Sequence, residues 1–97
     1  MTAAERFPHL DAHALAMLQR YEEKRGVMSI PVADARVGQT IYENPARKHL
    51  SGEVLEVRAS TVAERRDGHA DVVAVVSSPF AGSAPYAVSG SLHVDPS

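Results

Sequence analysis

The chain has 97 residues and a formal net charge of −2 at pH 7, with 10 lysines and arginines against 12 aspartates and glutamates. This length supports a single domain over 1–97, and the near-neutral balance excludes the basic surface of a general nucleic-acid binder. Cysteine is absent, which excludes disulfides and cysteine metal sites, and no apolar run is long enough to span a membrane. We therefore expect a cytoplasmic protein with no nucleic-acid partner and no membrane partner.

The first quarter of the chain predicts one helix behind a short arm. Residues 1–8 show no hydrophobic period and are expected to form an N-terminal arm. Asp11 is a preferred N-cap and Gly26 is a preferred helix terminator, so we predict a helix over 11–25. The first half of this helix is apolar on nearly every side, which is typical of a helix that is buried on most faces.

Residues 27–95 predict an antiparallel meander of four to five strands. Strand signals occur at 27–32, 37–42, 52–64, 70–78 and 86–94. The third of these has the longest alternation of polar and apolar residues, and the fourth has valines on both faces, as a central strand does. Asp67-Gly68 predicts a hairpin turn between them. The sequence therefore predicts an α+β fold in which one buried helix is wrapped by an antiparallel sheet.

One helix wrapped by an antiparallel sheet is the arrangement of the hot-dog fold, and three segments support a closer comparison. Met17–Arg25 is similar to the helix of 4-hydroxybenzoyl-CoA thioesterase-like proteins, which often ends in a Glu-Glu-x-Arg pattern. Ile41–Ala46 resembles the Tyr-x-x-Pro-Ala step of this family, and Gly52–Ala59 resembles the strand that follows it. The chain therefore resembles this family over roughly residues 9–95.

The resemblance implies a hot-dog hydrolase or binder of acyl thioesters. The substrate would be a small acyl-CoA or the thioester of an acyl carrier, and no cofactor is expected. Because 15 of the apolar residues are alanine, the core of a single chain would be thin. A homodimer or higher oligomer, with edge strands paired across a two-fold axis, would compensate for this.

Hot-dog thioesterases use a carboxylate near the helix, and Asp11 is the first candidate for this nucleophile or base. Glu22 is the second candidate, and His13 is a candidate orienting or proton-transfer group. The two carboxylates would lie about 16 Å apart along the helix, so at most one of them can be the catalytic carboxylate of one chain. A helix cap is the simpler interpretation of Asp11, and a solvated helix end is the simpler interpretation of Glu22.

Substrate-binding residues are expected after the second strand. Arg47 and Lys48 would meet the phosphates of the carrier, while Tyr42 and Pro45 would line an acyl tunnel. Each of these residues also has a simpler role, as a solvated charge, a packing residue or a strand stop.

A metal site at the start of the helix is a further hypothesis. His9 and His13 are four residues apart and flank Asp11, but His9 precedes the cap and no third histidine is close in sequence. We therefore expect no metal site.

A second architecture fits part of the same sequence. The strand signals between residues 37 and 76 also have the rhythm of a small SH3-like barrel. Such a domain would be a non-catalytic module that binds a protein partner. Deletion of residues 1–26 separates the two hypotheses, because a barrel closes on its own strands whereas a hot-dog sheet needs the helix that it wraps.

Overall fold

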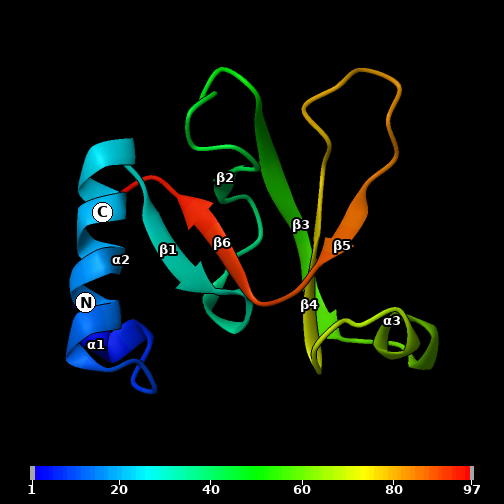
Figure 1. Ribbon diagram of the computed structural model, residues 1–97. Helices are drawn as coiled ribbons and strands as arrows, with labels where there is room; N and C mark the ends of the chain where they lie inside the picture. Colours follow the sequence, from blue (N-terminus) through cyan, green and yellow to red (C-terminus); the bar gives the residue numbers. More distant parts are fainter. Residues whose placement is uncertain (1, 97) are drawn as a thin grey trace.

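The computed structural model describes residues 2–96, which form an α+β fold with one six-stranded antiparallel sheet (Figure 1). The elements in chain order are α1 (Ala3–Arg6), α2 (Ala12–Arg25), β1 (Met28–Pro31), the 3-10 helix η1 (Val32–Asp34), β2 (Thr40–Tyr42), β3 (Ser51–Ala59), α3 (Val62–Arg66), β4 (Val72–Val76), β5 (Tyr86–Val88) and β6 (Ser91–Val94). The sheet has one strand more than the four to five expected, because the last strand signal divides into β5 and β6.

The sheet folds back on itself through the long strand β3. The strand order is β1-β6-β2-β3-β4-β5. β3 pairs with β2 through Ser51–Glu53 and with β4 from Val54 to Ala59, with a register shift between Val54 and Glu56. Only Ser89 and Gly90 separate β5 from β6, and Gly90 has a φ of 87° that favours glycine. The chain therefore turns a corner from β5 into β6, which returns to pair with β2 and closes a ring of strands (Figure 1).

The core lies inside this ring and is built mainly from β-branched side chains. Its buried members are Ile30, Val32, Ile41, Val54, Ala74, Val76, Leu92 and Val94. Two neighbouring residues of β4, Val73 and Ala74, are both fully buried, so this strand is covered on both faces as its valines predict. The strands and Val32 of η1 thus fill the interior without any residue of α2.

The expectation of an enclosed helix is wrong. No residue of α2 is buried, and the helix lies beside β1 at one end of the sheet (Figure 1). Met17, in the apolar first half of the helix, is 54% exposed. The three alanines of this half offer little apolar area, and the valines of the strands already occupy the interior. Only one side of α2 is partly covered, by the N-terminal segment and the sheet.

A short helix replaces the end of the long strand expected over 52–64. β3 ends at Ala59, and α3 begins after Thr61, whose hydroxyl accepts a hydrogen bond from the backbone N–H of Glu64 while the carboxylate of Glu64 accepts one from the N–H of Thr61. This reciprocal capping box favours a helix here more strongly than the alternating polar and apolar residues favour a strand. The segment around Gly68 therefore ends a helix instead of forming a two-residue hairpin turn.

Candidate functional site

A groove opens between α2, the loop after β2 and the loop after β4. Its volume is about 530 Å³. We call it the aromatic groove and define it by its lining residues, which are Tyr21, Glu43, Asn44, Pro45, Arg47, Leu50, Pro79, Phe80 and His93. Both loops rise from the same end of the sheet (Figure 1). Three rings and two prolines thus meet at one concave surface.

Local hydrogen bonds shape the loop after β2. The side-chain oxygen of Asn44 accepts a hydrogen bond from the N–H of Ala46 at 3.0 Å, and the carbonyl of Asn44 accepts one from the N–H of Arg47 at 2.9 Å. This turn, which Asn-Pro favours, buries Pro45 and directs the chain at Arg47 along the groove. The hydroxyl of Tyr86 reaches the carboxylate of Glu43 at 3.4 Å and ties the loop to β5.

The loop after β4 presents the most exposed ring of the groove. Phe80 is 55% exposed. Its N–H donates to the hydroxyl of Ser78 at 3.2 Å, and its carbonyl accepts from the N–H of Ser83 at 3.2 Å. Because this exposed ring lines a concave surface, it is available for contact with a ligand.

Tyr21 and His93 form the floor of the groove. Their ring centroids are 5.7 Å apart, and Nδ1 of His93 lies 3.4 Å from the hydroxyl of Ser29. Burial lowers the pKa of His93, against an opposing effect of the Glu22 carboxylate, and thereby favours the neutral imidazole. Both rings also line a second pocket of about 350 Å³ beside the N-terminal arm, which contains Phe7 and His9.

Arg47 supplies the cation of the groove. Within residues 2–96, its guanidinium makes no hydrogen bond and no ion pair; only its backbone is engaged, since its N–H donates to the carbonyl of Asn44 and its carbonyl accepts from the N–H of Leu50. An exposed cation without a protein partner, next to apolar rings, can bind an anionic group of a ligand.

The candidate carboxylates of α2 have other partners. Asp11 is exposed and caps the helix, since its side chain accepts a hydrogen bond from the N–H of Ala14 at 2.8 Å. Neither Asp11 nor His13 lines the aromatic groove or the pocket beside the arm. Glu22 is not a solvated helix end: its side chain is 11% exposed, and its carboxylate pairs with Arg6 at 3.0 Å.

Of the four residues expected to bind the substrate, two line the aromatic groove and two do not. Pro45 and Arg47 lie together in the aromatic groove. Tyr42 instead donates its hydroxyl to the carboxylate of Asp95 at 2.8 Å, and this hydrogen bond raises the pKa of Tyr42. The ammonium group of Lys48 lies 5.3 Å from the centre of the Tyr42 ring and donates to the carbonyl of Gly26. Lys48 therefore fastens its loop to the end of α2.

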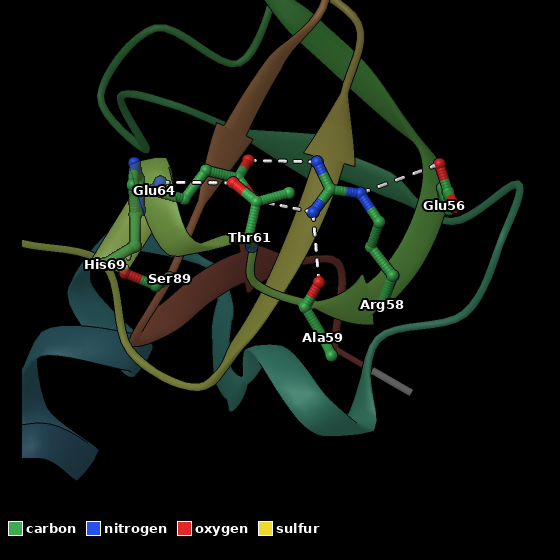
Figure 2. A network of polar contacts seen from close by, with 7 residues as sticks. All are labelled: Glu56, Arg58, Ala59, Thr61, Glu64, His69 and Ser89. Carbon is green, nitrogen blue, oxygen red and sulfur yellow. Dashed lines mark hydrogen bonds and ion pairs between the residues drawn. The ribbon is translucent and has the colours of Figure 1, made fainter. Parts of the chain in front are cut away.

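A separate polar network holds α3 against β3 (Figure 2). The two terminal nitrogens of Arg58 bind the two carboxylate oxygens of Glu64 at 2.6 and 2.9 Å, which is a bidentate pair. This contact, together with the N–H of Thr61, lowers the pKa of Glu64 to about 2. Nearby, Nδ1 of His69 lies 3.1 Å from the hydroxyl of Ser89. These contacts are structural, because each charged group already has its partner.

Among residues 2–96, no group of three or more histidines, aspartates or glutamates could hold a metal ion. None of the helices described is long and apolar enough to cross a membrane.

No family model matches this chain, and no curated protein and no solved structure matches it. The arguments about function therefore depend on the geometry of the aromatic groove and on the residues around it. Sequence reasoning found Pro45 and Arg47 but missed Tyr21, Phe80 and His93. The available signal was the scarcity of aromatic residues, which make up 5% of the chain, combined with the polar surroundings of Phe80.

Proposed function

We propose that this protein is a non-catalytic interaction module whose aromatic groove binds an extended, proline-containing segment of a protein partner. The observation that carries this proposal is the convergence of three rings and two prolines from four separate segments on one open groove. Grooves lined by aromatic side chains recognise proline-rich segments, because the extended conformation of such a segment is already formed before binding.

The arrangement of the strands supports the same proposal. The ring that β2, β3 and β4 form with the β5–β6 corner is the pattern of an SH3-like barrel, which closes without help from a helix. A hot-dog fold would need a helix enclosed by the sheet, whereas no residue of α2 is buried. Modules of the barrel type bind partners with their loops and leave the strands as a scaffold.

The charges of the groove point to the chemistry of the partner. Among residues 2–96 the guanidinium of Arg47 has no partner, whereas the carboxylate of Glu43 accepts a hydrogen bond from the hydroxyl of Tyr86. The groove therefore favours a segment with a proline for the rings and an aspartate or glutamate for Arg47.

Acyl-thioester hydrolysis by a hot-dog enzyme receives less support from the same contacts. Asp11 is exposed, caps the helix and lines none of the pockets described here for residues 2–96. Glu22 lines a pocket of about 490 Å³, but its carboxylate is already bound by Arg6 and by the N–H of Ser29, whereas a catalytic carboxylate has to be available to the substrate. The geometry thus favours binding over hydrolysis.

The proposal is tested by titrating the protein with fluorescent proline-rich peptides that contain or lack an acidic residue. We expect the acidic peptides to bind more tightly, and Phe80→Ala to weaken their binding by about 10- to 30-fold, as the loss of a central aromatic contact does. Arg47→Ala should remove the preference for the acidic peptide.

The matched control is Met17→Ala, which truncates an equally exposed apolar side chain outside the groove and should leave binding unchanged. The proposal is wrong if no proline-rich peptide binds. It is also wrong if the protein hydrolyses acyl-CoA and Asp11→Asn abolishes that hydrolysis.

A further inference from the structure

A second pocket continues the aromatic groove towards the N-terminal arm. Its volume is about 350 Å³, and Tyr21 and His93 line both concave surfaces. We call it the arm pocket and define it by its lining residues, which are Phe7, His9, Leu10, Leu18, Tyr21, Ser29, Ser91 and His93. Because the groove and the arm pocket share one pair of rings, they form a continuous depression that a single ligand can follow.

The arm pocket differs from the aromatic groove in its charge. Apart from its two histidines, no charged side chain is among the described residues that line it, whereas the groove has Glu43 and Arg47. Phe7, Leu10 and Leu18 contribute apolar surface, and each of them is only half-buried. Such surface favours an apolar group that displaces water from it, and it offers no partner to an ion. The arm pocket therefore matches a large, uncharged, apolar side chain.

The two concave surfaces follow one another along α2. Lys48, in the loop after β2, donates to the backbone carbonyl that ends this helix, so the loop and its Arg47 lie beside the C-terminal end of α2. The arm precedes α2 and lies at the opposite end of the helix (Figure 1). Leu18 lies about one turn before Tyr21 in the direction of the arm. A segment that crosses the pair of Tyr21 and His93 therefore meets Arg47 on one side and the arm pocket on the other.

The size of the ring pair sets the spacing along the bound segment. The centroids of Tyr21 and His93 are 5.7 Å apart. A polyproline helix advances about 3.1 Å per residue, so crossing the pair takes about two residues of an extended segment. A side chain about two or three residues from the proline that contacts these rings thus reaches the arm pocket.

We propose that the arm pocket is a second subsite of the aromatic groove, and that it binds a large apolar side chain of the same proline-containing segment. This side chain lies on the side of the proline opposite to the acidic residue that Arg47 binds. The inference rests on the proposed function of the groove and describes the partner more closely. The partner segment carries an acidic residue, a proline and an apolar residue in one extended stretch.

The experiment titrates the protein with fluorescent peptides that contain one acidic residue, one proline and a test position. The test position lies about two or three residues beyond the proline and holds either leucine or alanine. Each peptide is made with the acidic residue first and with the test position first. In one of these two orders, we expect the leucine peptide to bind about 5- to 10-fold more tightly than its alanine counterpart, because the arm pocket removes the larger side chain from water.

Two variants of the protein locate the bound leucine. Leu18→Ala removes apolar surface from the arm pocket, and Ser91→Leu fills the pocket from an exposed position of β6, while neither residue lines the aromatic groove. Both variants should reduce the preference for leucine to less than about 2-fold and leave the affinity for the alanine peptide unchanged. The matched control is Leu15→Ala, because Leu15 is also a half-buried leucine of α2 but lines neither surface.

The outcomes separate this inference from the proposed function. Equal binding of the leucine and alanine peptides would overturn the second subsite and leave the aromatic groove as a binding site for proline, whereas no binding of either peptide would overturn both. A preference for leucine that persists in the Leu18→Ala and Ser91→Leu variants would place the leucine elsewhere and overturn the subsite. Circular dichroism reports whether the variants are folded, and Ser91→Leu decides the result if Leu18→Ala unfolds.

Analytical ultracentrifugation of the protein without peptide tests another occupant of the arm pocket. We expect the wild-type protein to sediment as one chain of 10.4 kDa. A dimer of the wild type that Ser91→Leu dissociates would show that a second copy of the chain fills the pocket, and this result would also overturn the proposal.

Discussion

The ion pair between Arg58 and Glu64 makes the stability of the protein dependent on acid. Glu64 has a pKa of about 2 in the fold, compared with an ordinary value of 4.5, chiefly because Arg58 binds the ionised carboxylate. A carboxylate with a lowered pKa stabilises the fold fully above its ordinary pKa. This contribution is lost as the pH falls from about 4.5 towards 2, because the carboxyl group is protonated first in the unfolded chain.

We therefore expect Glu64→Gln to flatten the decline in stability between pH 4.5 and pH 2, the interval set by the two pKa values. The urea concentration at half-unfolding, measured across this interval, gives the result. Glu23→Gln is the control, because Glu23 is exposed and makes no ion pair within residues 2–96. An identical pH dependence in wild type and Glu64→Gln would show that the pair with Arg58 does not stabilise the fold.

Single residues show which parts of the aromatic groove local sequence signals can indicate and which they cannot. Pro45 and Arg47 could be named because Asn-Pro and a basic pair are local signals. Tyr21, Phe80 and His93 could not be brought together, since they come from α2, a loop and β6. These three side chains lie close together because the ring of strands closes. The spacing of residues in the sequence does not predict this closure.

At the scale of elements, the ends of α2 follow the local signals closely. Asp11 caps the helix as expected, and Gly26 ends it with a φ of 65°. What the local signals do not determine is the depth at which the helix is buried. An apolar surface of mostly alanine is compatible with a buried helix or with one that lies on the surface, and the packing of the strands decides between them.

Asp11 provides the prediction for this element. We expect Asp11→Ala to lower the free energy of unfolding by about 1 kcal/mol, because the N–H of Ala14 loses its acceptor. Asp11→Asn should cost much less, since asparagine caps helices nearly as well as aspartate. Chemical denaturation of both variants provides the comparison. Equal losses for both variants would mean that the charge of Asp11, and not its capping oxygen, stabilises the protein.

At the scale of the whole molecule, we expect the strands to remain folded without α1 and α2, because the strands form a closed ring. Deletion of residues 1–26 removes α1 and α2 but none of the hydrogen-bonded pairs between strands. We expect the shortened chain to keep a β-type circular dichroism spectrum and a cooperative thermal transition. The transition temperature should fall, because Val27, which is 2% exposed in the full chain, would meet water.

Hydrogen exchange of the full chain independently tests whether the strands remain folded when α2 opens. The amides of α2 should exchange faster than those of β3 and β4, because the helix can open while the ring stays intact. If the deletion abolished cooperative unfolding, or if the helix and the strands exchanged together, the helix would be integral to the core, as a hot-dog fold requires.

The α+β class and most of the strand positions could be predicted from the sequence, because they follow from alternation and from turn residues. The ring could not be predicted. It depends on Ser89 and Gly90, which divide one strand signal into β5 and β6 and give each half a different partner. The turn at Gly90 thus separates a simple meander from a closed ring of strands. In the sequence, however, this glycine looks like a glycine at any other bend.

The corner at Ser89 and Gly90 also imposes an order on folding during translation. β2 and β3, β3 and β4, and β4 and β5 are neighbours along the chain and can pair as they leave the ribosome. β1 must wait for β6, the last strand to be synthesised. Arg6, Glu22 and Ser29 are all synthesised long before β6. Their contacts can therefore cover β1 until β6 is available and keep it from pairing with other nascent chains on the same messenger RNA.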